Sequence, residues 1–202
     1  MARMPLAQRR QQLVEAAIVV LTREGVPKTT TRAIVAEAGT SLSVFHYCFD
    51  SKQELLDAVI KTLVGTTVDL AEASFDAGAS RRQMIRAGLT AYWKHVVANP
   101  DQHLLTYELT QYCLRKPGYA AVARQQYDHY ANAFIAVLDA IGAQPVVSPE
   151  VIGRYLSATV DGLTLDWLVR RDDRVAEQVL DLMARHIDEF MLQPEPAGVT
   201  AR

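Results

Sequence analysis

The stretch of residues 29–54 constrains this chain more than any other, because its residues mark two short helices joined by a tight turn. Thr29 or Thr30 can cap the first helix, since a threonine oxygen accepts a hydrogen bond from a backbone N–H that the first turn leaves unpaired. Gly39 ends that helix, because glycine adopts a left-handed backbone at low cost. Ser41 can cap the second helix in the same way as the threonines.

A third, longer helix should start at Ser51, because Ser51 and Glu54 have the S-x-x-E spacing of a capping box. A helix, a glycine turn and a second short helix form the helix-turn-helix plan, in which the second helix enters the major groove of DNA. Phe45 and Phe49 lie four residues apart in that second helix and should face the core. Its outer surface then carries Leu42, Ser43, His46 and Tyr47.

Apolar residues recur at helical spacing along the rest of the chain, whereas the alternation typical of a β-strand is rare. Half of the 202 residues are hydrophobic, which is enough for a sizeable core. The sequence therefore predicts an all-α protein of about nine helices. Turn residues place these helices near residues 5–24, 30–38, 42–49, 51–75, 80–98, 100–115, 119–141, 148–171 and 172–192.

The net charge of −2 argues against a general coat for nucleic acid, but the charge is unevenly distributed. Residues 1–53 hold seven Lys or Arg and four Asp or Glu, whereas residues 54–202 hold fourteen and nineteen. A mildly basic head on an acidic body suits a protein that touches phosphates at one end only. The start of the first helix holds Arg3, Arg9 and Arg10, which are either a solvated basic end or donors to phosphate.

The sequence favours the reducing cytoplasm as the compartment of this protein. Cys48 and Cys113 are far apart and form no C-x-x-C pair, so neither a disulfide framework nor a structural zinc site is expected. The first ten residues lack the apolar core of a signal peptide. No apolar run is long enough to suggest a membrane span.

Motifs of catalysis and of metal or cofactor binding are absent from the sequence. The five histidines show no H-E-x-x-H or paired metal-ligand spacing, and there is no G-x-S-x-G, P-loop or G-x-G-x-x-G pattern. Asp161 and Asp166 lie five residues apart on a predicted helix and point in different directions. We therefore expect no enzyme activity, no metal and no cofactor. A helical scaffold that binds a protein partner without DNA, and a helical enzyme, are the alternative interpretations.

Residues 29–55 resemble the signature of the tetracycline-repressor (TetR) family of bacterial regulators, which is similar to T-T-x-R-x-I-A-x-x-A-G-V-S-x-x-x-L-Y-x-H-F-x-S-K-x-x-L. The pattern stands here as Thr29, Thr30, Arg32, Ile34, Ala38, Gly39, Ser41, Phe45, His46, Phe49, Ser51, Lys52 and Leu55. Three differences from the family matter for DNA binding. His46 replaces the usual tyrosine, Cys48 replaces the usual histidine, and Leu42 stands where a polar or basic residue is frequent. The operator sequence therefore cannot be transferred from the family.

The resemblance implies a helix-turn-helix domain at residues 1–62 and a domain for effector binding and dimerisation at residues 63–192. The remaining residues, 193–202, should form a disordered tail, since they contain two prolines and a glycine. The resemblance also implies a homodimer that pairs through the last two helices. Its expected function is that of a repressor released from a palindromic DNA operator by a small molecule.

The residues expected to bind DNA combine the outer surface of the second helix with the flanking motif positions. Leu42 and Ser43 are assigned to base edges, where Leu42 could pack against a thymine methyl group. Contacts to phosphate are expected from Thr31, Arg32, His46, Tyr47 and Lys52, and Arg32 could also reach a base. The full predicted set is Thr31, Arg32, Ser41, Leu42, Ser43, His46, Tyr47 and Lys52.

The residues expected to bind the effector are mostly aromatic, because a tyrosine or tryptophan offers an apolar face with one polar handle. The resemblance places several of them on helices around an effector cavity, and core packing is the alternative interpretation. An acid among the rings would favour a cationic ligand, although a large apolar ligand also fits. The predicted set is Tyr92, Trp93, His103, Tyr107, Tyr127, Tyr130, Asp161 and Trp167.

Overall fold

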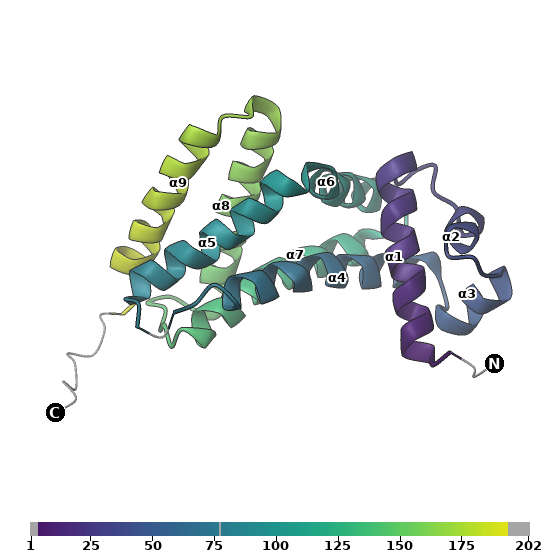
Figure 1. Cartoon of the computed structure of the whole chain (residues 1–202), viewed down its shortest axis with the longest axis horizontal. Helices are drawn as coiled ribbons and strands as arrows, with labels where there is room; N and C mark the ends of the chain where they lie inside the picture. Colours follow the sequence, from purple (N-terminus) through teal and green to yellow (C-terminus); the bar gives the residue numbers. More distant parts are fainter. Residues whose placement is uncertain (1–3, 77, 194–202) are drawn as a thin grey trace. The chain divides into compact units, whose positions relative to one another are not determined.

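The fold is entirely helical, as the sequence predicted. A computed structural model describes residues 4–76 and 78–193, and within them the only extended pairing is an isolated bridge between Pro145 and Leu192. A short π-helical turn, Ile187–Met191, follows the last helix. The helices are α1 Leu6–Glu24, α2 Thr31–Glu37, α3 Leu42–Cys48, α4 Lys52–Glu72, α5 Arg81–Ala98, α6 Pro100–Arg115, α7 Ala120–Ala140, α8 Pro149–Arg170 and α9 Asp173–His186 (Figure 1). Arg3 and the predicted tail, except for Gln193, lie outside the described residues.

Several of the predicted helix starts are confirmed by their caps. The Thr30 side chain accepts from the N–H of Ala33 at the start of α2, and Gly39 has a φ of +60° after its end. Later helices follow the same rule, since Ser148 accepts from Val151 at the start of α8 and Asp172 does the same for α9.

Two cap predictions were wrong in detail. Ser41 occupies the N-cap position of α3, but its hydroxyl lies 2.8 Å from that of Ser43 and makes no bond to the backbone. At the start of α4, Ser51 accepts from the N–H of Glu54 as expected. The Glu54 carboxylate accepts from the N–H of Asp50 instead of that of Ser51, and it also binds Arg10 of α1.

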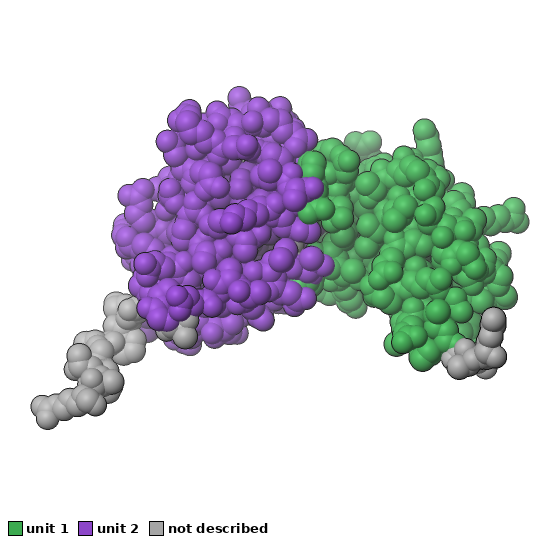
Figure 2. Space-filling model, viewed as in Figure 1, with its two compact units in different colours: residues 1–65, 99–129 green, residues 66–98, 130–202 purple. Residues whose placement is uncertain are grey.

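The chain forms two compact units (Figure 2). The first contains residues 1–65 together with 99–129, so it includes α6 and the first half of α7 beside the predicted head. The second contains residues 66–98 together with 130–202. The predicted boundary at residue 62 divides the chain into two continuous domains. The first compact unit instead combines the N-terminal residues with the later residues 99–129.

The first unit is built on an apolar stripe of α1, which packs against α2, α3 and α6. The stripe follows the i, i+3, i+4, i+7 spacing that puts residues on one face of a helix. At the end of α1, Gly25 (φ +79°) turns the chain where α6 approaches it, since an added Cβ would lie 2.9 Å from the Glu108 carboxylate. The buried residues of this core include Leu13, Ala17, Val20, Leu21, Ile34, Phe45, Phe49, Leu55, Leu56 and Leu109.

The second unit is held by α5, α8 and α9, whose apolar faces form one core. Trp93 of α5 and Trp167 of α8 meet edge to face at 5.7 Å between ring centroids. Helix α8 also crosses α7 closely at Gly153, because a Cβ there would lie 2.8 Å from the backbone oxygen of Ala131. The packing of these helices therefore requires a glycine at residue 153.

Candidate DNA-binding surface and effector site

Helix α3 has two distinct faces, as its spacing predicted. Phe45 and Phe49 are each 1% exposed, and their rings pack together at 5.8 Å between centroids. The side chains on the opposite side point to solvent, and Tyr47 is 60% exposed. That surface consists of Ser41, Leu42, Ser43, His46 and Tyr47. The short helix thus presents hydroxyl, imidazole and phenol groups on a rigid apolar base.

The start of α2 adds a cationic group to this surface. Arg32 is exposed and forms no ion pair or hydrogen bond within the described chain. Thr31 is half-buried beside it. Thr29, in contrast, is buried and donates its hydroxyl to the Gly25 oxygen at 2.8 Å, so it stabilises the turn before α2. A guanidinium without a protein partner is well suited to a DNA phosphate.

Lys52 is more enclosed than its assignment to phosphate implied. Its ammonium donates to the backbone oxygen of Thr29 at 2.6 Å and lies 5.6 Å from the centroid of the Tyr112 ring. Burial, followed by the neighbouring charge of Lys116, lowers the pKa of Lys52. The residue therefore joins the start of α4 to the start of α2, and a phosphate contact would have to share its ammonium with Thr29.

Arg10 fixes the orientation of α3, a role that neither sequence interpretation of this residue included. Its guanidinium donates to the backbone oxygen of Cys48, the last residue of α3, and to the Glu54 carboxylate at 2.8 Å. It also lies 4.2 Å above the Phe49 ring. A cation at a helix C-terminus is favoured by the helix dipole. No sequence signal could have identified this contact, because its partners lie 38 and 44 residues away.

The structure divides the predicted effector residues between the two units. In the second unit the Tyr92 hydroxyl lies 3.2 Å from that of Thr164. Burial raises the pKa of Tyr92, and the nearby Tyr130 and Asp161 raise it further. Three of the predicted residues, Tyr92, Tyr130 and Asp161, thus interact electrostatically within one unit. They come from three different helices, α5, α7 and α8.

The two predicted tryptophans match the core-packing alternative. Trp93 and Trp167 are almost fully buried against each other. The indole N–H of Trp167 donates to the Asp173 carboxylate at 2.7 Å, which ties the end of α8 to the start of α9. Their packing energy stabilises the unit, and their rings offer little free surface to a ligand.

The other predicted effector residues lie in the first unit. His103 is buried, Tyr107 is half-buried and Tyr127 is exposed. Sequence reasoning missed Gln126, which is 1% exposed on α7. Its amide donates to the Thr106 oxygen at 3.1 Å and its oxygen lies 3.1 Å from the Thr110 hydroxyl, both on α6. A buried amide with two partners holds α6 and α7 in register.

Helices α8 and α9 expose large apolar side chains at helical spacing, which together we call the α8–α9 face. The two helices are linked on this face by the rings of Tyr155 and His186, whose centroids are 6.0 Å apart. Gly162 is also exposed there, and an added Cβ would meet no other atom within 4 Å. The exposed large hydrophobic residues of these helices and of the turn after them are Val151, Tyr155, Leu165, Val169, Val175, Leu182 and Phe190. An apolar surface of this kind marks an interaction site.

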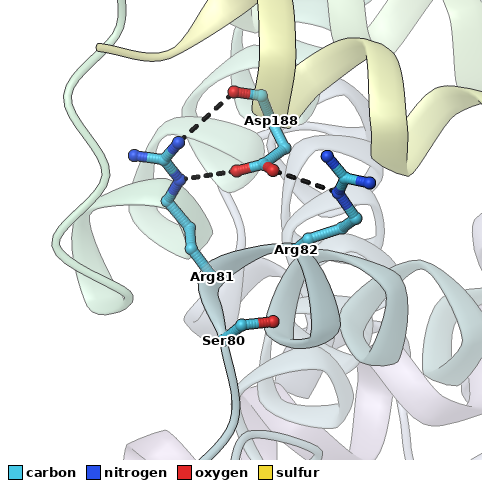
Figure 3. A pocket seen from close by; sticks show the side chains of 4 residues that line it. All are labelled: Ser80, Arg81, Arg82 and Asp188. Atoms are coloured by element: carbon cyan, nitrogen blue, oxygen red, sulfur yellow. Dashed lines mark hydrogen bonds and ion pairs between the residues drawn. The ribbon is translucent and has the colours of Figure 1, made fainter. Parts of the chain in front are cut away.

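A polar pocket near the start of α5 is occupied by its own side chains (Figure 3). Arg81 donates to the Asp188 carboxylate at 2.8 Å, and Arg82 donates to its other oxygen at 3.1 Å. Burial alone would raise the pKa of Asp188, but the hydrogen bonds of the two arginines outweigh it and leave the pKa lowered. The cluster therefore ties the turn after α9 to α5 and has no free cation for a ligand.

The described residues contain neither a metal-binding group nor a membrane-spanning helix. No group of three or more His, Cys, Asp or Glu side chains there could hold a metal ion. None of the described helices combines the length and apolar character that crossing a bilayer requires.

Comparison with known protein families assigns this chain to a family. Residues 13–59 match the family model "Bacterial regulatory proteins, tetR family", and residues 79–189 match "Tetracyclin repressor-like, C-terminal domain". The chain belongs to the TetR family. It is accordingly a DNA-binding transcriptional regulator, in a family for which ligand response and homodimers are typical.

Curated relatives and solved structures agree with this TetR assignment. The chain is 27% identical over 193 residues to the nicotine-responsive transcriptional repressor HdnoR of Paenarthrobacter nicotinovorans, covering 94% of this chain and 100% of the relative. It is 38% identical over 79 residues to the regulator BetI of Rhizobium meliloti, covering 39% of each chain.

The same fold occurs in solved regulators of low sequence identity. A transcriptional regulator from Rhodococcus sp. Rha1 has a TM-score of 0.67 at 21% identity, with 90% of this chain and 97% of the other covered. A TetR regulator from Haloarcula marismortui has the same TM-score and identity, with 93% and 100% covered. At this identity the likeness shows the fold alone.

Proposed function

We propose that this TetR regulator is a repressor that binds a palindromic operator as a homodimer and leaves it when a small organic cation binds. One observation carries the DNA-binding part of the proposal. Helix α3 exposes hydroxyl, imidazole and phenol groups, including those of Ser43, His46 and Tyr47, directly above the buried Phe45 and Phe49. A surface of this kind can donate and accept at base edges while its helix stays rigid.

A homodimer is supported by the exposed face of α8 and α9. Two copies of that face would bury the large hydrophobic side chains that a single chain leaves in solvent, including Leu182 and Phe190. Gly162 would let the paired helices approach closely, since nothing in its own chain occupies the space above it. A two-fold dimer presents two α3 helices, which must lie about 34–36 Å apart to enter successive major grooves.

A cationic effector is supported by the environment of Tyr92. This residue shares one part of the second unit with Tyr130 and Asp161, so that two aromatic rings accompany one carboxylate. Aromatic faces and a carboxylate both attract a cation, and the contribution grows when the site is desolvated. The relative HdnoR is nicotine-responsive, and nicotine contains a basic amine. The same chemistry in this chain favours an amine over a neutral apolar ligand.

Release from DNA would follow from a shift in population. A ligand that binds better to a dimer with the wrong α3 spacing draws the population away from the DNA-binding form. Helix α4 carries the chain from one compact unit to the other, since it begins at Lys52 and ends at Glu72. It is the element that we propose transmits the change.

The function is tested by selecting DNA fragments that the purified full chain binds. We expect a palindromic sequence with half-sites about one helical turn apart. Its affinity should fall when His46 and Tyr47 are replaced together by alanine. A scaffold or an enzyme without DNA binding would enrich no sequence, and that result would refute the repressor function.

Replacing Asp161 with asparagine should weaken the binding of amine effectors by about 10- to 100-fold, because it removes a charged hydrogen-bond acceptor. The probes are a panel of small amines that includes nicotine, each beside a neutral analogue of similar size. Thermal shift identifies the binders, and titration calorimetry measures their affinity. Asp166→Asn is the matched control, since Asp166 lies on the same helix and pairs with the exposed Arg170.

Two outcomes would contradict the cationic effector. Neutral analogues could bind wild-type protein as tightly as the amines, or Asp161→Asn could bind the amines like wild type. An amine that binds tightly but leaves operator affinity unchanged would contradict the release mechanism instead.

A further inference from the structure

Two lysines of the first unit approach the same aromatic ring. The ammonium groups of Lys52 and Lys116 lie 5.6 and 5.0 Å from the centroid of the Tyr112 ring. Lys116 also donates to the Tyr112 hydroxyl at 2.6 Å and lies 4.6 Å from the Tyr119 ring. Lys52 starts α4, whereas Lys116 follows the last residue of α6. Residues far apart in the sequence thus bring two positive charges together.

These two charges have no acidic partner in the described chain, whereas three other cations of the first unit do. Arg10 pairs with Glu54, Arg23 with Glu37 and Lys61 with Asp57, each through a contact of 2.8 or 2.9 Å. Neither Lys52 nor Lys116 forms such a pair among the described residues. Two like charges held close together repel each other, and an anion between or beside them would relieve that repulsion.

Both lysines are held beside the helices that we propose bind DNA. The ammonium of Lys52 is bonded to the Thr29 oxygen, immediately before the cap of α2. The turn that holds Lys116 is bonded to α4, because the Gln53 amide donates to the Gly118 oxygen at 2.7 Å. Lys28, next to Thr29, adds an exposed cation that forms no ion pair with the described residues.

We propose that Lys116, together with Lys52, binds a phosphate of the operator backbone, so that the turn between α6 and α7 contacts DNA beside the helix-turn-helix. This inference rests on the proposed DNA binding and extends its footprint. A lysine ammonium binds phosphate as a point charge and needs no special geometry. Lys116 falls within residues 79–189, which match the C-terminal domain of the family. The domain expected to bind the effector would therefore hold DNA directly.

The test measures the salt dependence of operator binding for Lys116→Gln in the full chain. Each phosphate contact contributes about 0.9 to the slope of log affinity against log salt. A dimer that loses one contact per subunit should show a slope shallower by about 2, on operator and on random duplex alike. Lys116→Arg should keep the wild-type slope. Arg124→Gln is the matched control, because Arg124 is an exposed cation of the same unit without an ion pair in the described chain.

The outcomes separate this inference from the proposed function. Wild-type protein that binds no operator would refute the function itself. An operator slope that stays unchanged in Lys116→Gln, with the melting temperature preserved, would refute only the phosphate contact. An equal change in Arg124→Gln would also refute it, because the effect would then come from net charge alone.

A separate titration with inorganic phosphate tests whether the lysines bind a free anion instead of a DNA phosphate. If it stabilises wild type but not Lys116→Gln while the DNA slopes agree, the lysines bind a free anion and the DNA assignment is wrong.

Discussion

Phe45→Ala should lower the free energy of unfolding by about 3–5 kcal/mol, the range for truncating a buried aromatic side chain. Phe45 is 1% exposed, and its ring packs on that of Phe49 beneath the DNA-binding surface. Since a domain is stable by only about 5–15 kcal/mol, this loss takes much of the stability of the first unit. Urea denaturation followed by circular dichroism measures the change, and operator binding should be lost with it.

Tyr47→Ala is the matched control, because Tyr47 lies two residues away on the same helix and is 60% exposed. Its unfolding free energy should stay within about 0.5 kcal/mol of wild type, as is usual at surface positions. Its operator affinity should nevertheless fall at least about tenfold, which corresponds to about 1.4 kcal/mol of lost contact with DNA. Equal destabilisation by the two variants, or full operator affinity in Tyr47→Ala, would contradict the two-faced account of α3.

Leu182→Glu should convert the dimer to monomers, because it places a charge in the apolar face of α8 and α9. Leu182 is 60% exposed in the single chain, so the new carboxylate is solvated in the monomer and loses that solvation only on pairing. Operator affinity should fall by about 10²- to 10⁴-fold, because each half-site is then bound without the help of the other. Sedimentation velocity gives the oligomeric state, and fluorescence anisotropy gives the affinity.

Leu104→Glu provides the control for this experiment. Leu104 is 47% exposed on α6, so the variant adds the same charge to an exposed leucine outside the α8–α9 face. It should remain a dimer and bind operator like wild type. A dimer in both variants would place the interface elsewhere on the chain.

Local signals in the sequence predicted several features of residues 29–54. The cap at Thr30, the left-handed Gly39 and the four-residue spacing of Phe45 and Phe49 each depend only on near neighbours. These features could be predicted because backbone capping and helical periodicity act over a few residues.

Contacts between distant segments could not be predicted from these local patterns. The sequence can assign the charges of Arg10 and Lys52 only to solvent or phosphate, yet each side chain binds a backbone oxygen of another segment. The aromatic residues of the second unit could not be told apart either. Helical spacing does not distinguish Tyr92, which interacts with Tyr130 and Asp161, from the tryptophans that fill the core. Only the three-dimensional packing decides which ring has which neighbours.

The close crossing at Gly153 limits how the packing of α7 and α8 can change. With the Ala131 oxygen 2.8 Å from the space of a Cβ, even an alanine would push α8 away from α7. In the effector site that we propose, a change of inducer preference would instead act through rings such as Tyr92 of α5 and Tyr130 of α7. Such substitutions would change ligand specificity while the packing of α7 against α8 stays the same.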